Sequence, residues 1–177
     1  MGFLRGAMPG SNERIAMYLT EVTASSAGKT DFLSFQLGGL DYGVEFRKVK
    51  ELRTLQSLER FASDGAIISG VAVSRGVIMP IVDMRVAFNA GAKVTGPMTD
   101  VIILQLANCV VGMVVDGVTD VVGMYADQIT PIPGSDGEGE CDYLMGLGEA
   151  HGRRLILVDI DKLMSIRRDT GTEQLVA

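Results

Sequence analysis

The sequence predicts an all-β fold made of two small barrels that pack against each other. Apolar segments are short and are separated by glycine-rich corners, as expected for small curled sheets. Few windows have the length and the 3.6-residue period of a helix, and hairpin patterns recur instead. Related blocks also repeat along the chain, which indicates two copies of one unit.

The first predicted hairpin consists of FLSFQL (32–37), the tight turn GGLD, and YGVEF (42–46). VIILQL (101–106), the turn AN, and CVVGMVV (109–115) repeat this pattern in the second half. These second-half strands are apolar at nearly every position instead of alternating with polar residues. Both faces of each strand are therefore predicted to be covered.

Two internal similarities support a duplication. The block IISGVAVSRGVIMPIVDMR (67–85) matches YLMGLGEAHGRRLILVDIDK (143–162) without gaps at an offset of 76 (143 − 67). A second match places Gly43 opposite Gly112, an offset of 69 (112 − 43). Each half would then contain a hairpin, a variable loop, a second hairpin and a helix-like tail.

The predicted organisation has one folded domain between two tails. Residues 1–30 are expected to form a flexible N-terminal tail and residues 165–177 a C-terminal tail. The domain between them, 31–164, would divide into its two barrel subdomains near residues 90–100.

Composition narrows the classes of function. The 177 residues carry a net charge of −6, and no cluster of Lys and Arg is suited to phosphates, so no nucleic-acid partner is expected. Apolar runs fall short of the roughly 20 residues of a membrane span, and the N-terminal residues lack the basic-then-apolar pattern expected of a signal peptide. The chain is therefore expected to be cytoplasmic, without direct insertion into a membrane.

Asp83 and Asp159 occupy equivalent places in the two repeats. Paired carboxylates can act as acid and base or bind a metal. Each aspartate, however, ends a predicted strand and precedes a segment with helical spacing, MRVAF or IDKLMSIRR. Capping of the following helix is the favoured interpretation, because a carboxylate accepts hydrogen bonds from the free N–H groups of the first turn.

Other residues also give little indication of a catalytic or metal-binding role. His151 is the only histidine, which excludes a multi-histidine metal site, and it is predicted to lie exposed in a turn. The acidic segment SDGEGECD (135–142) lacks the calcium-loop spacing and reads as a solvated loop. Cys109 is expected to act as a small hydrophobe, and it and Cys141 have no redox or metal spacing. No catalytic constellation, metal site or cofactor is predicted.

Four blocks of the sequence resemble the CheW family of bacterial chemotaxis coupling proteins. They are FLSFQLGGLDYGVEFRKVKE (32–51), GVAVSRGVIMPIVDMRVAF (70–88), VGMVVDGVTDVV (111–122) and YLMGLGEAHGRRLILVDIDKL (143–163). The resemblance implies two pseudo-repeated, five-stranded, Src-homology-3-like barrel subdomains with short helices. It also implies a cytoplasmic scaffold without catalytic activity or cofactor. Such a scaffold links the tips of membrane chemoreceptors to the regulatory domain of the histidine kinase CheA and can self-associate in arrays.

The resemblance also implies contact residues. The positions similar to the family's receptor-binding region are Val44, Phe46, Val49, Glu51, Arg75 and Gly76. Those similar to its kinase-binding region are Val101, Gly112, Val121, Thr130 and Ser135. For the four valines, filling the barrels is the favoured alternative. Arg75 can pair locally with an acid or present its guanidinium to a partner.

The chain departs from the family pattern at three places, one of which is the loop LERFASDGAI (58–67), where the family's usual proline is missing. Val73 and Ser74 precede the Arg-Gly pair where relatives commonly have Asn and an aliphatic residue. The segment ITPIPGS (129–135) lacks the arginine, the acid and the aromatic ring that relatives often carry there, so a ring-closing contact through residues 130–135 is in doubt.

Three functions follow from different classes. The first is the chemotaxis adaptor, and the second is a related adaptor for another kinase pathway, in motility or development. The third is a small metal-dependent hydrolase that uses Asp83, Asp159 and the acidic loop.

Overall fold

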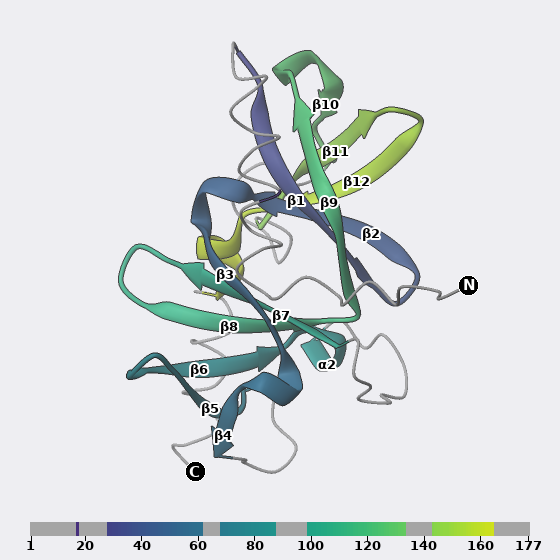
Figure 1. Cartoon of the computed structure of the whole chain (residues 1–177). Coiled ribbons are helices and arrows are strands. Elements are labelled where there is room, and N and C mark those ends of the chain that lie inside the picture. The colour runs from purple at the N-terminus through teal and green to yellow at the C-terminus, as the bar shows by residue number, and fades with distance from the viewer. Residues whose placement is uncertain (1–16, 18–27, 62–67, 88–98, 134–142, 165–177) are drawn as a thin grey trace, which may run out of the picture.

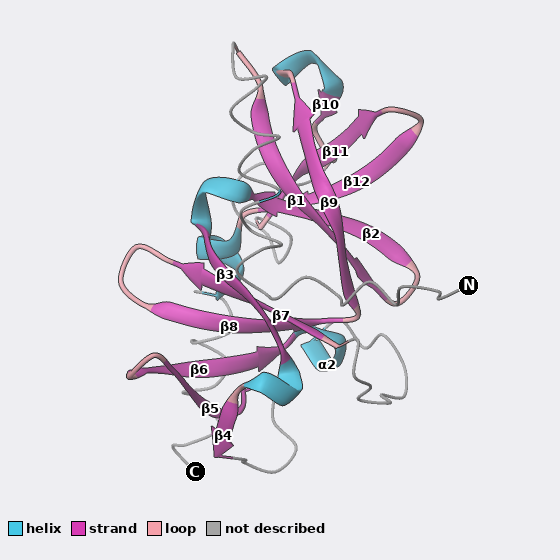
Figure 2. Cartoon of the chain, viewed as in Figure 1, coloured by secondary structure: helices cyan, strands magenta, loops and turns pink. Residues whose placement is uncertain are grey.

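The all-β prediction is confirmed by two six-stranded sheets (Figures 1 and 2). The structure is a computed structural model. It describes residues 17, 28–61, 68–87, 99–133 and 143–164. The predicted C-terminal tail lies outside these residues, as does the predicted N-terminal tail except for residues 17 and 28–30. No helix in the described ranges is long and apolar enough to cross a membrane.

Barrel A is the sheet with the strand order β10-β11-β12-β2-β1-β9. Its strands are β1 (Thr30–Leu37), β2 (Leu40–Glu45), β9 (Gly117–Met124), β10 (Ile129–Thr130), β11 (Leu144–Ala150) and β12 (Arg153–Val158). The two edge strands, β9 and β10, are consecutive in the chain and are joined by the 3₁₀ turn η3 (Ala126–Gln128). The turn thus carries the chain from one edge of the sheet to the other.

Barrel B has the order β3-β7-β8-β6-β5-β4. Its strands are β3 (Val49–Thr54), β4 (Glu59–Phe61), β5 (Ile68–Ser74), β6 (Val77–Asp83), β7 (Asp100–Gln105) and β8 (Val110–Val115). The 3₁₀ turn η2 (Leu55–Ser57) joins the edge strands β3 and β4, as η3 does in barrel A. Each sheet has six strands where the resemblance implied five, because these turns divide one long segment into two strands.

The two repeats exchange their first hairpins. The β1–β2 hairpin pairs with β9 and β12 of the second repeat, while β7–β8 pairs with β3 and β6 of the first. The chain therefore passes between barrels at η1 (Phe46–Lys48) and at Asp116. The predicted subdomain boundary near residues 90–100 is wrong, since it assumed that each repeat folds on itself.

The register confirms the duplication itself. Leu157 of β12 lies opposite Gly43 of β2 in a parallel pair, and Ile81 of β6 lies opposite Gly112 of β8 in the corresponding pair. These positions differ by the offsets found in the sequence, 76 (157 − 81) and 69 (112 − 43). At both glycines an added Cβ would lie within 3 Å of the facing Leu or Ile side chain. Absence of a side chain there lets the parallel strands pack closely.

Both faces of the central strands are buried, as the continuous apolar runs predict. In β1, Phe32 belongs to the core inside barrel A, whereas the next residue, Leu33, belongs to a larger core with members from both barrels. In β7, Ile103 lies in the core of barrel B, and its neighbours Ile102 and Leu104 lie in the shared core. One apolar cluster therefore joins the two sheets.

The Arg-Gly pair is a hairpin turn. Arg75 and Gly76 both have positive φ, 50° and 77°, between the paired residues Ser74 and Val77. His151 and Gly152 repeat this geometry with φ of 51° and 72°. Two consecutive residues with positive φ are typical of the type I′ turn, which suits the twist of a hairpin. The prediction that His151 lies exposed in a turn is confirmed.

We expect Gly76→Ala to lower the free energy of unfolding by about 1–2 kcal/mol, because alanine is strained at positive φ. An added Cβ at Gly76 would meet no atom within 4 Å, so the cost is backbone strain alone. Gly117→Ala is the matched control, with equally open surroundings and no positive φ. Urea denaturation of both variants checks this, and equal destabilisation would contradict it.

Candidate partner-binding surface

Asp83 caps a short helix, as predicted. Its Oδ1 accepts a hydrogen bond from the backbone N–H of Arg85 at 3.0 Å, at the start of α2 (Met84–Ala87). The structure adds a contact that the sequence pattern did not reveal. The Arg85 guanidinium donates to both carboxylate oxygens at 3.0 Å, and its side chain is 4% exposed. The Asp83 carboxylate therefore neutralises a buried cation.

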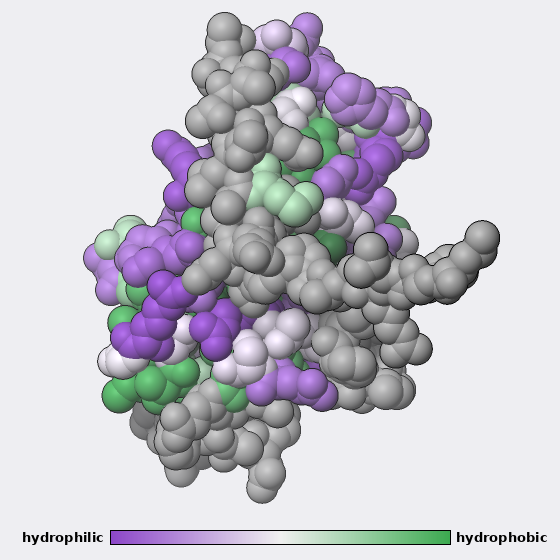
Figure 3. Space-filling model, viewed as in Figure 1, coloured by the Kyte–Doolittle hydropathy of each residue, from purple (hydrophilic) through white to green (hydrophobic). Residues whose placement is uncertain are grey.

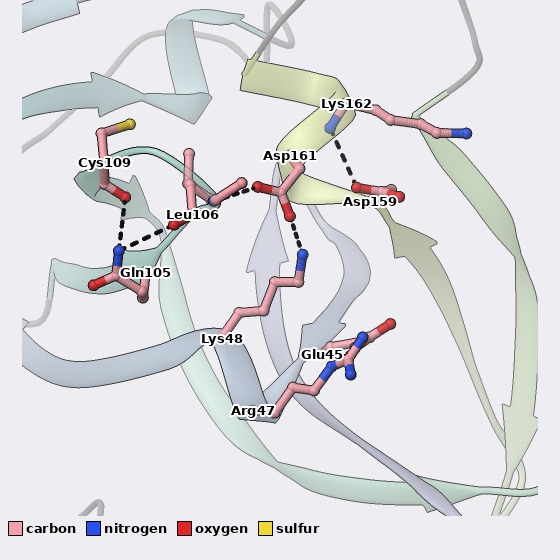
Figure 4. Close-up of polar contacts among 10 residues, drawn as sticks. Glu45, Arg47, Lys48, Gln105, Leu106, Cys109, Asp159, Asp161 and Lys162 are labelled. Atoms are coloured by element: carbon pink, nitrogen blue, oxygen red, sulfur yellow. Dashed lines mark hydrogen bonds and ion pairs between the residues drawn. The ribbon is translucent and has the colours of Figure 1, made fainter.

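Asp159 is also a cap, confirming the second part of that prediction. Its Oδ1 accepts a hydrogen bond from the backbone N–H of Lys162 at 3.2 Å, next to the helical residues 160–164. Figure 4 shows the neighbouring Asp161 pointing the other way, toward Lys48 in η1. Asp161 also accepts a hydrogen bond from the N–H of Ala107, in the β7–β8 loop, at 3.0 Å. These contacts hold the helical residues 160–164 against η1, where the chain passes between the barrels, and against the β7–β8 loop.

The metal-dependent hypothesis requires carboxylates that come together around an ion. Among the residues that the structure describes, no group of three or more His, Cys, Asp and Glu side chains is placed to hold a metal ion. Asp83 and Asp159 are occupied as caps on different helices. The acidic segment 135–142 lies outside the described residues.

The apolar residues of the predicted receptor-binding set are mainly core residues. Val44 and Phe46 are 1% and 7% exposed and belong to the shared core, against which Val49 packs. Val44 also lines a shallow pocket of about 80 Å³, where β2 and η1 face Val158 and the start of the terminal helix. These side chains support the walls of the surface and contribute little exposed area themselves.

The polar residues of that set lie together at one end of barrel B. Glu51 Oε1 lies 3.2 Å from Arg53 Nη1 and 3.5 Å from Arg75 Nη2. The Glu51 side chain is 13% exposed, whereas that of Arg75 is 63% exposed. The local pairing predicted for Arg75 is therefore confirmed, and the exposed part of its guanidinium leaves contact with a partner as a prediction.

A pocket of about 260 Å³ opens beside this ion-pair cluster. Its lining residues are Lys50, Glu51, Ser74, Arg75, Val77, Met79, Ile103 and Val110. Apolar walls with a polar rim are typical of sites that receive a side chain from a partner. The segment 44–51 runs from the shallow pocket at Val44 to this one, so it connects both hollows.

The predicted kinase-binding residues do not form one surface. Val101 is fully buried, and Gly112 is buried in barrel B beneath the side chain of Ile81. Neither can contact a partner directly, because the hairpin exchange places both strands in the interior of the sheet. Val121 is partly buried against the shared core, Thr130 is exposed in β10, and Ser135 lies outside the described residues.

Exposed apolar residues follow the Arg-Gly turn. Val77 and Ile78 are 44% and 72% exposed, and hydrophobic surface is visible over this end of the β5–β6 hairpin in Figure 3. The apolar run VIMP (77–80) after Arg-Gly is the sequence signal for this exposed apolar surface. The run predicts only a strand, because an apolar run does not show which of its members face solvent.

Comparisons with known proteins agree with this architecture. The family model described as CheW-like domain matches residues 31–168. The chain is 44% identical over 142 residues to a chemotaxis protein CheW from Klebsiella aerogenes, covering 78% of this chain and 86% of that protein. It is 26% identical over 149 residues to protein FrzA from Myxococcus xanthus, covering 83% and 92% of the two chains.

A solved structure supports the fold. The crystal structure of scaffolding protein TtCheW from Thermoanaerobacter tengcongensis matches with a TM-score of 0.65 at 21% identity, covering 74% of this chain and 89% of that one. The family match spans both barrels, and it includes the Arg-Gly turn and the strands around it. The chain therefore belongs to the CheW-like domain family and is an adaptor of the chemotaxis coupling type.

Proposed function

We propose that this adaptor couples the cytoplasmic tips of methyl-accepting chemoreceptors to the regulatory domain of the histidine kinase CheA. The family match over residues 31–168 carries the proposal. The cluster of Glu51, Arg53 and Arg75 beside an apolar-walled pocket supplies a surface suited to a receptor helix. The protein would then act in the cytoplasm at membrane receptor arrays, through contacts alone and without catalysis.

The kinase would bind a different surface. Thr130 in β10 and the partly buried Val121 in β9 are the remaining described residues of the predicted kinase-binding set. Because segment 129–135 lacks the charge and the ring that relatives often carry, we propose that self-association and ring contacts through it are weak. Separate weak surfaces still yield a stable array when several engage together.

Co-sedimentation tests the receptor contact. The protein is expected to sediment with membranes that contain a chemoreceptor and to stay in solution with receptor-free membranes. Recovery in the supernatant in both cases would contradict the proposed function. A pull-down against other CheA-like kinases separates the alternative role, in which the protein is an adaptor for another kinase pathway.

Arg75→Ala is expected to weaken receptor binding by about tenfold, because exposed arginines at partner surfaces often carry much of the affinity. The free energy of unfolding should change by less than about 1 kcal/mol, since the Arg75–Glu51 pair is largely exposed on the arginine side. Calorimetric titration and thermal unfolding measure the two effects. A large fall in melting temperature would instead show that Arg75 is structural.

A further inference from the structure

The duplication allows the two barrels to be compared position by position at one end. The offsets place three residues of barrel A opposite three of barrel B: Ser34 with Ile103 (103 − 34 = 69), Asp120 with Glu51 (120 − 51 = 69), and Arg153 with Val77 (153 − 77 = 76). Strand register supports the equivalence. Ser34 is paired with Asp120 in barrel A, and Ile103 is paired with Glu51 in barrel B.

In barrel A this end is filled by a polar cluster. Arg153 Nη1 lies 2.8 Å from both carboxylate oxygens of Asp120, and Nη2 donates to Ser34 Oγ at 3.0 Å. Ser34 is fully buried. The hydrogen bond with Asp120 raises the pKa of Arg153. A guanidinium from the chain itself therefore occupies this end of barrel A.

In barrel B the same end is open. Val77 stands where barrel A has Arg153, and the pocket of about 260 Å³ occupies this position. Glu51 remains at the position equivalent to Asp120, but its partners are Arg53 on β3 and Arg75 in the β5–β6 turn. The barrel therefore keeps the carboxylate and lacks the residue that would fill the space next to it.

Ser74 gives independent evidence for an occupant. It lines the pocket, it is 6% exposed, and its Oγ has no hydrogen-bond partner among the described residues. The equivalent residue in barrel A is Ala150 (150 − 74 = 76), which has no polar group to satisfy. A buried hydroxyl without a partner is destabilising. A ligand that accepts a hydrogen bond from the Ser74 hydroxyl would explain why this group lies at the pocket.

The surrounding charge selects the class of ligand. Lys50, Glu51 and Arg75 line the pocket, and Arg53 contacts Glu51, so three cations and one carboxylate lie in the pocket lining or next to it. The local balance is +2 (3 − 1) in a chain whose net charge is −6. A cationic group would be repelled, whereas a carboxylate is attracted and can accept the Ser74 hydroxyl proton in a hydrogen bond. The apolar walls suit an aliphatic stem.

We propose that this pocket receives a glutamate side chain from a helix of the partner. The identity of that helix as part of a chemoreceptor tip rests on the proposed function. The glutamate stem would pack on Val77, Met79 and Ile103, and its carboxylate would accept a hydrogen bond from Ser74 near the rim cations.

Two variants of the full chain test the pocket with a chemoreceptor cytoplasmic fragment. Val77→Arg reproduces the plug of barrel A and is expected to lower affinity at least about tenfold without loss of melting temperature. Ser74→Ala is expected to lower affinity about tenfold, since hydrogen bonds to charged groups are strong, while the melting temperature stays the same or rises. Val71→Arg, on a residue that is 37% exposed and outside the pocket lining, is the control and should bind normally.

A small probe tests the chemistry without the receptor. In NMR titrations, butyrate is expected to shift the resonances of Ser74, Val77 and Ile103, butyramide to shift them less, and butylammonium not at all. The butyrate shifts should vanish in Val77→Arg and weaken with added salt. No butyrate response, or a stronger response to butylammonium, would overturn the proposal.

The two experiments fail in different ways. If the receptor fragment binds the unmodified chain and binds both pocket variants within twofold, the pocket proposal is wrong and the proposed function stands. If butyrate fills the pocket but no receptor fragment binds the chain, the pocket chemistry stands and the proposed function is wrong.

Discussion

Asp83→Ala is expected to lower the free energy of unfolding by about 3–5 kcal/mol, because it leaves the Arg85 guanidinium as an unpaired buried charge. The Arg85 side chain is 4% exposed, and its guanidinium donates to both carboxylate oxygens of Asp83. The change also removes the helix cap. Urea denaturation would measure the effect, with the slope of unfolding free energy against urea concentration unchanged.

Asp159→Ala is the matched control, since Asp159 occupies the equivalent place in the second repeat and also caps a helix. It has no arginine pair in the described structure, so its loss should cost only about 1 kcal/mol. Arg85→Met combined with Asp83→Ala should recover part of the stability, because it removes the stranded charge. Equal costs for the two aspartates would show that the buried ion pair contributes nothing beyond capping.

Phe35→Ala is expected to lower the free energy of unfolding by about 3–5 kcal/mol and to destabilise both barrels together. Phe35 is 1% exposed, stacks on Tyr42 with ring centroids 5.9 Å apart, and belongs to the core shared by the two sheets. Because each barrel also contains a hairpin from the other repeat, neither barrel can unfold alone without losing strands.

Fluorescent probes placed separately in barrel A and barrel B would follow this unfolding. The transitions should coincide in the unmodified chain and in Phe35→Ala, with a lower midpoint in the variant. Gln36→Ala, at the next position on β1 where the side chain is exposed, is the control and should change stability by less than about 0.5 kcal/mol. Two separate transitions would contradict the shared core.

Local features of the fold could be predicted from the sequence because they depend on neighbouring residues. The turn GGLD between two apolar runs predicted the β1–β2 hairpin, and the spacing around Asp83 and Asp159 predicted two caps. The offset of 76 identified equivalent hairpins, which the structure confirms. In each case a turn or a strand period fixes the outcome within about ten residues.

Exchange of hairpins between repeats could not be predicted in this way. A repeat pattern shows that two units are alike. It does not show whether β6 pairs with the first hairpin of its own repeat or with β7–β8 of the other repeat. The same limit explains Val101 and Gly112, whose burial depends on strands far away in the sequence. The Asp83–Arg85 pair was missed for another reason, since burial of an arginine depends on how the surrounding structure packs.

The candidate site was predicted in part. Glu51 and Arg75 were among the predicted receptor-contact residues, and the structure places their charged groups 3.5 Å apart beside a pocket. Ser74 was noted only as a departure from the family pattern. Its buried, unpartnered hydroxyl became visible once the strand pairing fixed which face of β5 points into the barrel.

Sedimentation of three components tests the adaptor role most directly. Membranes that contain a chemoreceptor are mixed with CheA, with and without this protein, and the CheA in the pellet is measured. We predict that CheA sediments with receptor membranes only when the protein is present, and much less when Arg75→Ala replaces it. CheA sedimentation that is the same with and without the protein would contradict the account.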